Sequence, residues 1–534
     1  MGPVIRQATP HDAAAWVELL RTSLGPDYPE RQVYEPTWAA GQLAPPEGQE
    51  TWVAEGAGGL QGAVSILPPA LASKNPIVNL GRDLLRPEAY VNGAALALFQ
   101  KLTTLASDRG QMLVARVLAS DLQRQSLLEE LGFTCVGFQP FKHLLRRREG
   151  ILFYLGVGRP DLIPRALVSE SLSQVSELAT TVLSNLKLAP PSAVRDGVTG
   201  YPLHTELSLR EVLLAEYEAA RAHAQISHPP VEVSGGANLG WGFLRLTNSA
   251  PVHALVAQRG TGIVAGMAYV VDELDRCVRV VEAFATDDLS PGALLHRLSK
   301  LTQEKYNGVY LEADILMTAP RLLKSAEQVG LVPVAYLPSV SSRSTAHVDV
   351  VKLVKLNMAY GLENARLTTH AKTIADIVDR NFQDQKVGVA VINLLRGLRV
   401  FDGLGDGELR KISRLFTQKL FRPGDRIFVK GDSGTEAYVV MRGQVDILLD
   451  ERAKPIATFG NGQIFGELTF LDASPRAAMA VASQPSIVLV VQRVAFNELV
   501  EREPHLGMVV MRNIAIELSN RLRRTNVAVA SAPK

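Results

Sequence analysis

The chain has 534 residues, of which 47% are hydrophobic and 21% are charged, a composition typical of globular proteins and not of disordered or membrane-embedded ones. A single core rarely serves more than about 250–300 residues, so about three domains are expected. The 56 basic and 54 acidic residues nearly balance, which provides no electrostatic footprint for nucleic acid. Nucleic acid is therefore not expected as a partner.

Cysteine and histidine usage bounds the remaining chemistry. The only cysteines are Cys135 and Cys277, which argues against a disulfide framework or a cysteine-based metal site. Histidines such as His204 and His296 lack ligand spacing with a carboxylate or a cysteine, so no metal is expected. The opening residues lack a secretory signal, and no apolar run is long enough to span a bilayer. We therefore expect a cytoplasmic protein without membrane contact.

The first 140 residues alternate strand-like and helix-like segments. Hydrophobic periodicity predicts strands over 3–9, 51–56, 60–68, 78–85 and 112–118, helices over 12–24, 94–110 and 121–131, and a closing pair of strands from residue 133. This alternation predicts a mixed α/β sheet.

An internal repeat determines the organisation of the middle of the chain. The sequence LLEELGFTCVGFQP at 127–140 recurs as KSAEQVGLVPVAYLP at 324–338, and VARVL at 114–118 falls at the same offset on EADIL at 312–316. Further upstream, VAEGAGGLQGAVSI resembles VAQRGTGIVAGMAYV. Self-similarity at a fixed spacing indicates two copies of one fold.

Between and after the copies the pattern changes. A helical and proline-rich segment over 159–251, with a loop at 235–242, separates the copies, and its role is not readable from the sequence. Residues 356–399 have helical spacing without strand signals and predict a helical connector. From Phe401 onward, short β-branched runs separated by glycines predict a β-barrel or jelly roll.

The segment FGELTFLDASPRAAMAVA at 465–482 closely resembles the phosphate-binding cassette of cyclic nucleotide-binding domains. A buried cyclic phosphate needs a guanidinium and backbone donors near a helix start, and Arg476 is the candidate. The resemblance implies that Glu467 accepts the ribose 2'-hydroxyl. Its null alternative is a plain Glu467–Arg476 salt bridge in a β-roll. The predicted cAMP site comprises Phe465, Gly466, Glu467, Leu468, Arg476, Ala477 and Ala478.

Other features of the module agree with this resemblance. The family often has threonine or serine at the position of Ala477 to bind the guanine of cGMP, so alanine favours cAMP. Gly424, Gly431 and Gly443 match the family's glycine turns. The helices after the barrel match its lid and dimer helix, which makes a homodimer one expectation. Ten residues follow Arg524, too few for the family's DNA-binding motif, so we expect the output upstream.

The first copy resembles the GNAT acetyltransferases through IRQATPHDAAAW, LLRPEAYVNGAALALFQKL and SLLEELGFTCVGF. That family holds the coenzyme A pyrophosphate on a turn of the type Arg/Gln-x-x-Gly-x-Gly/Ala at a helix start. Here the turn begins with Tyr90 in place of Arg or Gln. The resemblance implies acetyl-CoA binding by Leu84, Leu85, Tyr90, Val91, Asn92, Gly93, Ala94 and Ala95.

Catalytic candidates follow from the same resemblance. Asp83 is the nearest candidate base, and Leu128 stands where the family often has a tyrosine as general acid. In the second copy Pro291 matches Gly93 and offers no backbone N–H to a phosphate. We interpret the second copy as structural or substrate-facing.

The predicted fold class is a multidomain α+β chain with two GNAT-like mixed α/β sheets and a C-terminal jelly roll with flanking helices. Its parts are a GNAT-like domain at 1–148, a degenerate GNAT-like domain at 149–355, the helical connector at 356–399 and a cyclic nucleotide-binding domain at 400–534. The predicted function couples cAMP binding to acetyl-CoA-dependent N-acetylation of a protein lysine or another amine. Two alternatives stay open: a non-catalytic cAMP receptor with an interaction surface, and a small-molecule amine acetyltransferase.

Overall fold

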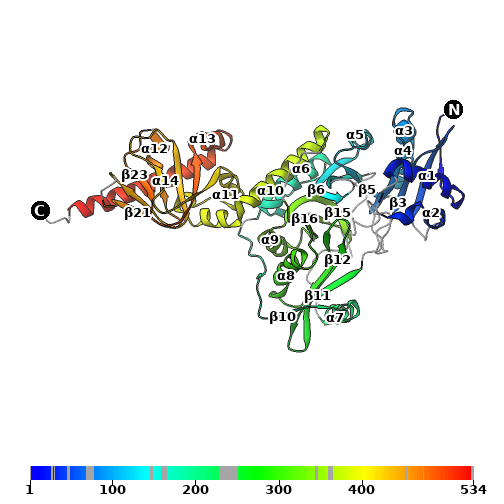
Figure 1. The fold of residues 1–534 in the computed structure, drawn as a ribbon, viewed down its shortest axis with the longest axis horizontal. Helices are drawn as coiled ribbons and strands as arrows, with labels where there is room; N and C mark the ends of the chain where they lie inside the picture. The colour runs from blue at the N-terminus through cyan, green and yellow to red at the C-terminus, as the bar shows by residue number, and fades with distance from the viewer. Residues whose placement is uncertain are drawn as a thin grey trace. The chain divides into compact units, whose positions relative to one another are not determined.

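The computed structural model divides into two compact units, Met1–Asn381 and Phe382–Lys534, and their boundary falls within helix α10 (Thr369–Arg396) (Figure 1). Among the residues described, no helix is long and apolar enough to cross a membrane. The predicted loop at 235–242 lies outside them. The structure describes residues 2–530 except 26–27, 29, 45–48, 68–76, 145–147, 158–164, 167, 196, 228–250, 343–346, 359–364, 451–453 and 473.

The first copy of the repeat contains seven strands. Its elements are β1 (Val4–Gln7), η1 (Pro10–Asp12), α1 (Ala13–Leu24), η2 (Arg31–Tyr34), α2 (Pro36–Leu43), β2 (Glu50–Gly56), β3 (Gly59–Leu67), β4 (Ile77–Leu85), α3 (Pro87–Val91), α4 (Ala94–Asp108), β5 (Met112–Leu118), α5 (Leu122–Glu130), β6 (Thr134–Leu144) and β7 (Arg148–Val157). The predicted division at 148 falls on the first residue of β7, and this strand lies between β5 and β6 within the first copy.

The second copy follows a short intervening segment. That segment contains β8 (Glu170–Ser171), α6 (Ser173–Asn185) and β9 (Ala193–Val194). The copy itself consists of β10 (Ser208–Val212), α7 (Leu214–Ser227), β11 (Val252–Arg259), β12 (Gly262–Asp272), β13 (Cys277–Ala285), α8 (Ser290–Glu304), β14 (Tyr310–Leu316), α9 (Pro320–Val329), β15 (Val332–Ser342) and β16 (His347–Leu356).

Strand order confirms the repeat. The 14 strands form one sheet in the order β1-β2-β3-β4-β5-β7-β6-β15-β16-β14-β13-β12-β11-β10, so each copy has the same internal order and the two meet at equivalent strands. In each copy one pair is parallel, β4 with β5 and β13 with β14. The copies join through β6 and β15, where Gly137 lies opposite Ala335.

Amphipathic helices cover the sheet of the first copy. In α1 the buried side chains include Ala13, Trp16, Val17 and Leu20, which is the spacing of one helical face. They pack with residues of β2, β3 and β4, and Trp16 stacks on Trp38 of α2 at 5.9 Å between ring centroids. Burial of this face holds the helices on the sheet.

The second unit is a two-sheet roll with flanking helices. Its sheets have the strand orders β17-β24-β19-β22 and β18-β23-β20-β21, and buried side chains from both sheets form one apolar cluster. Its elements are η4 (Arg399–Phe401), α11 (Asp406–Ser413), β17 (Phe416–Phe421), β18 (Arg426–Phe428), β19 (Glu436–Arg442), β20 (Val445–Leu448), β21 (Ala457–Phe459), β22 (Ile464–Phe465), α12 (Glu467–Asp472), β23 (Met479–Ala482), β24 (Ser486–Gln492), α13 (Arg493–Arg502) and α14 (Pro504–Ala530).

The junction of the copies generates a prediction. A Cβ on Gly137 would lie 2.1 Å from the Cβ of Ala335 and 2.9 Å from the carbonyl oxygen of Val334, so Gly137→Ala must force the two backbones apart. We expect the unfolding free energy of the first unit to fall by about 1–3 kcal/mol, the usual cost of overpacking. The readout is tryptophan fluorescence in urea, because all four tryptophans lie before residue 242.

The matched control for this variant is Gly58→Ala, because a Cβ there meets no atom within 4 Å. Equal urea midpoints for Gly137→Ala and the wild type would show that the close approach at the junction is not a constraint on stability.

Candidate functional site

The interior of the roll is set by strand alternation. Successive side chains of a strand point to opposite faces, so Tyr438 and Val440 of β19 enter the interior cluster while Ala437 and Val439 face the helices. Phe465 of β22 stacks on Tyr438 at 5.0 Å between ring centroids. One face of the sheet thus borders the interior of the roll, and the other borders a helical layer.

Arg476 is buried against the inner face, with 3% of its surface exposed. Its Nη1 donates to the carbonyl of Gly466 at 2.9 Å, and its Nη2 donates to the carbonyl of Glu436 at 2.8 Å. The guanidinium carbon lies 4.3 Å from the centroid of the Phe428 ring and 5.4 Å from that of Tyr438. Fixed carbonyls and rings therefore hold this cation in one orientation.

The only carboxylate that pairs with Arg476 among the described residues is that of Glu436, at a long 3.4 Å from Nη2, and Nε of Arg476 makes no hydrogen bond there. A buried guanidinium with mostly neutral partners retains the capacity to bind an anion, since charge-assisted bonds are stronger than bonds to carbonyls. The site can therefore hold a phosphate.

Gly466 makes the position of Arg476 accessible. It has φ of 75°, and a Cβ there would lie 2.8 Å from Nη1 of Arg476. The predicted turn glycines Gly424, Gly431 and Gly443 also have positive φ, the conformation that glycine adopts without strain. The backbone therefore follows the course that the glycine pattern predicted.

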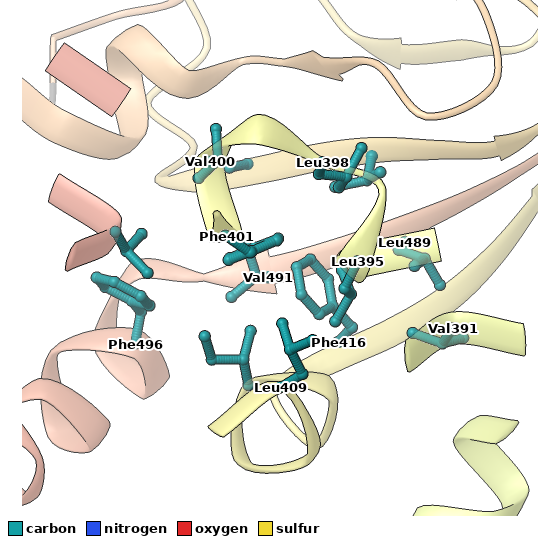
Figure 2. Close-up of a cluster of buried hydrophobic side chains, with 14 of the residues drawn as sticks. Val391, Leu395, Leu398, Val400, Phe401, Leu409, Phe416, Leu489, Val491 and Phe496 are labelled. Atoms are coloured by element: carbon teal, nitrogen blue, oxygen red, sulfur yellow. The ribbon is translucent and has the colours of Figure 1, made fainter. Parts of the chain in front are cut away.

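A second apolar cluster occupies the outer face of β19 and β24. Figure 2 shows its side chains converging from the helical segments and the strands. A cavity of about 600 Å³ lies beside it, and Glu467 and Phe470 of α12 are among its lining residues. Arg476 contacts Tyr438 on the opposite face of β19, so this large cavity is separate from the guanidinium.

The remaining predicted residues of this site differ in exposure. Leu468 is 56% exposed, Ala477 is exposed, and Ala478 is half-buried beside the start of β23. The structure therefore brings Phe465, Gly466 and Arg476 together, whereas the side chain of Leu468 faces solvent.

In the first unit, a gap opens between β4 and β5. Their parallel register ends at Leu80 opposite Ala115, although β4 continues to Leu85 and β5 to Leu118. On its other edge β4 shifts register against β3, and Arg82 within this bulge has φ of 51°. Bulges and strained residues of this kind concentrate at functional sites.

An ion pair spans this gap. The carboxylate of Asp83 pairs with Arg124 of α5, and Nε of Arg124 donates to the hydroxyl of Tyr90 at 3.1 Å. Burial raises the pKa of Asp83, and the charge of Arg124 opposes that shift. The three side chains connect the end of β4 with α3 and α5.

Two cavities adjoin the gap. One of about 410 Å³ borders the start of α4 and the face of α5, and its lining includes Tyr90, Val91, Gly93 and Ala95. Another of about 280 Å³ is lined by residues that include Asp83, Leu84, Leu85 and Tyr90. Of the remaining predicted residues, Asn92 accepts from the N–H of Ala94 at 3.0 Å.

The equivalent cleft of the second copy is filled by the chain itself. The carbonyl oxygens of Tyr201 and Pro202 lie 2.7 and 2.6 Å from where a Cβ of Gly292 would stand, at the start of α8. The ring of Tyr201 stacks under Arg321 of α9 at 4.2 Å, and its N–H donates to Ser325. Any ligand between α8 and α9 would have to displace this segment.

Sequence reasoning missed four side chains that line the smaller cavity of the first copy. They are Arg82, Arg116, Arg124 and His143. Arg124 is the third residue of α5, and a charge there is ordinarily solvated, so no spacing in the sequence singles it out. In the part of the chain that the structure describes, no three side chains are grouped so as to hold a metal ion.

Comparison with known proteins bears on the second unit. Residues 418–503 match the family model described as a cyclic nucleotide-binding domain. This segment of the chain is a cyclic nucleotide-binding domain. It includes Arg476, Gly466 and the whole cassette at 465–482.

Relatives match this domain and its flanks. The chain is 32% identical over 136 residues to the cyclic AMP receptor protein of Thermus thermophilus, which is 25% of this chain and 61% of that protein. It is 33% identical over 100 residues to the cAMP-dependent protein kinase regulatory subunit of Eremothecium gossypii, which is 19% of this chain and 21% of that protein. The chain thus spans under two thirds of each relative.

Among solved structures, the catabolite activator protein of Thermus thermophilus is similar, at 30% identity and a TM-score of 0.23, over 25% of this chain and 62% of that one.

The contact between Gly466 and Arg476 generates a prediction. Gly466→Ala places a methyl group against the guanidinium and forces alanine into a left-handed conformation that costs about 1–2 kcal/mol. We expect cyclic nucleotide affinity to fall by about tenfold or more, measured by calorimetric titration of cAMP and cGMP. Gly460→Ala is the control, because its nearest atom would be 3.9 Å away. Equal losses in both variants would refute the role of this contact.

Proposed function

We propose that the cyclic nucleotide-binding domain binds cAMP and that this binding regulates an acetyl-CoA-dependent N-acetyltransferase built on the first copy. The observation that carries the proposal is the buried Arg476, held beside Gly466 in a cyclic nucleotide-binding domain. The finer parts of the proposal rest on the assignments that follow. They include the division at 1–148, 149–355, 356–399 and 400–534 and a cytoplasmic location.

Two arguments favour cAMP over cGMP. The relatives named above include a cyclic AMP receptor protein and a cAMP-dependent kinase subunit. The residue after the phosphate-binding arginine is Ala477, which has no hydroxyl to donate to a guanine. Arg476 supplies the charge for the cyclic phosphate, and Glu467 at the start of α12 is the proposed acceptor for the ribose 2'-hydroxyl.

The geometry of the first copy supports an acetyltransferase. The strand order, the bulge in β4 and the gap between β4 and β5 are the arrangement expected of the GNAT fold that the sequence resembles. A Cβ on Gly93 would meet no atom within 4 Å, and Ala95 is small, so the start of α4 has room for a pyrophosphate. The residues present in the first copy fit the group.

Bound acetyl-CoA supplies an acetyl group activated as a thioester. The ends of β4 and α4 orient the reactants, which is the main contribution of such a site. A carboxylate oxygen of Asp83 takes the proton of the acceptor amine, and Arg124 holds that carboxylate in place. Tyr90, whose hydroxyl reaches the same gap, is the proposed proton donor where Leu128 cannot serve.

Helix α10 provides a route for regulation, because each of its ends is anchored in a different unit. Just before it, the carbonyl of Arg366 accepts from Gln125 at 2.9 Å, and the N–H of Thr368 donates to Gln125 at 3.1 Å. Gln125 is the neighbour of Arg124 on α5. At the other end, Val391 and Leu395 belong to the outer apolar cluster of the nucleotide-binding unit.

A second candidate function is a non-catalytic cAMP receptor that uses the duplicated folds as an interaction surface. The Asp83–Arg124 pair across the gap favours it, because a reactant between β4 and α5 must displace part of this contact. A cofactor cleft filled by residues 201–202 points the same way for the second copy. Acetyl-CoA binding separates the two functions.

The cAMP assignment makes a direct prediction. Arg476→Ala removes the guanidinium and leaves the phosphate without its charged partner, which costs about 3 kcal/mol or about a hundredfold in Kd. Arg476→Lys keeps the charge without the planar fork and should fall between the two. Calorimetric titration of cAMP and cGMP measures both, with exposed Arg422→Ala as the control. Wild-type affinity in a folded Arg476→Ala protein would remove the assignment.

The acetyl-CoA assignment and the coupling share one experiment. Acetyl-CoA is titrated into the full chain with and without saturating cAMP, and we expect a change in Kd of about tenfold, since coupling is usually worth about 1–3 kcal/mol. Linkage requires cAMP affinity to change by the same factor. An unchanged Kd would refute the coupling, and no acetyl-CoA binding would favour the receptor.

Gly93→Asp provides the site test for this titration. Aspartate tolerates the left-handed backbone at Gly93, but its charge repels a pyrophosphate, so binding should be lost without loss of folding. Gly110→Asp is the matched control, because Gly110 also has positive φ in open space, at the far end of α4. Retained acetyl-CoA affinity in Gly93→Asp would move the site elsewhere.

A further inference from the structure

The smaller cavity of the first copy is enclosed by elements that bring basic side chains together. It lies where β4 and β5 no longer pair, and the end of α1 closes it. Its volume of about 280 Å³ is below the range of about 300–1,000 Å³ typical of pockets for drug-sized ligands. The cavity is therefore suited to a small metabolite.

Cations outnumber acids in the lining. Asp83 and Asp121 both face Arg124, so these two acids are directed at one of the three arginines. Arg82 and Arg116 add two further guanidiniums, each at most 6% exposed. Burial makes such charges costly unless an anion compensates them.

Nearby acids outside the lining are engaged with other cations. Glu312 pairs with Lys142 and Arg279, and Asp314 pairs with Lys352 at 2.5 Å. Burial lowers the pKa of Arg116 to about 9, and the charge of Arg279 adds to this effect. An excess of positive charge therefore persists around Arg116.

The acids near the other two basic side chains are few. Burial likewise lowers the pKa of Arg82 to about 10, opposed by the charge of Glu30, whose carboxylate also accepts from Tyr28 at 2.8 Å. His143 lies against Asp275 of the second copy at 3.2 Å. The second copy thus positions a side chain of the first copy's cavity.

We propose that this cavity binds a small amine that carries a carboxylate, an amino acid in chemical class, with Arg116 and Arg82 at the carboxylate and Asp83 at the amine. A planar guanidinium matches a carboxylate with two parallel hydrogen bonds. The inference deepens the proposed function by naming the acceptor class. Binding in the cavity does not itself require acetyl-CoA, so the two ideas fail separately.

The test is a calorimetric titration of the full chain with each of the twenty L-amino acids, in the absence of acetyl-CoA. We expect at least one to bind and its decarboxylated amine to bind at least about tenfold more weakly, because the amine lacks the partner of the arginines. Spermidine represents the polyamine class. Binding of spermidine or of the decarboxylated amine as tightly as any amino acid would overturn the proposal, as would no binding by any amino acid.

Two variants locate the site. Arg116→Met and Arg82→Met each remove one guanidinium from the cavity, and each should weaken the amino acid by at least about tenfold. Lys352→Met is the matched control, because Lys352 is a buried cation near the same Phe153 ring as Arg116 but does not line the cavity. Unchanged affinity in both arginine variants, or an equal loss in Lys352→Met, would overturn the assignment.

Retained cAMP binding and an unchanged tryptophan spectrum serve to show that each variant is folded. If one arginine variant does not fold, the other decides the question. Amino-acid binding without acetyl-CoA binding would support the cavity and refute the transferase. Acetyl-CoA binding with no amino-acid binding would refute the cavity and leave the transferase standing.

Discussion

The closest approach of two backbones in the first unit, at Gly137 and Ala335, sets the relation between the two copies of the repeat. Because the strands that meet there are equivalent, the copies extend one sheet instead of packing face to face. Edge strands that pair in this way also cover each other's unpaired backbone groups. Side chains of the second copy, Asp275 and Glu312 among them, are thereby brought against Lys142 and His143 of the first.

This arrangement explains how two similar folds came to differ chemically. The first copy keeps an open start to α4 and two cavities beside its strand gap, whereas residues 201–202 fill the corresponding place in the second. At matching strand positions the first copy has Arg116 and the second has Asp314. The second copy therefore contributes charge and support at the junction, and the ligand sites concentrate in the first copy.

In the nucleotide-binding unit, strand alternation separates a polar function from an apolar one. Side chains of β19 that point inward surround Arg476, and those that point outward join the cluster formed with α10 and η4. The two environments share one strand but have opposite faces. A ligand at the guanidinium can therefore act on the helical layer through β19 and α12 without entering the apolar cluster.

The sequence by itself predicted the strand and helix order of the first copy, the repeat and the cyclic nucleotide-binding domain. Each depends on local periodicity or on a contiguous motif such as 465–482, because residues that act together there are close along the chain. Only the tertiary structure decided the rest. Arg124 reaches Asp83 and the chain at 201–202 fills a cleft nearly a hundred residues away, contacts that no spacing encodes. Side chains distant in sequence meet only when the sheet forms, and for that reason their burial and charge balance could not be read beforehand.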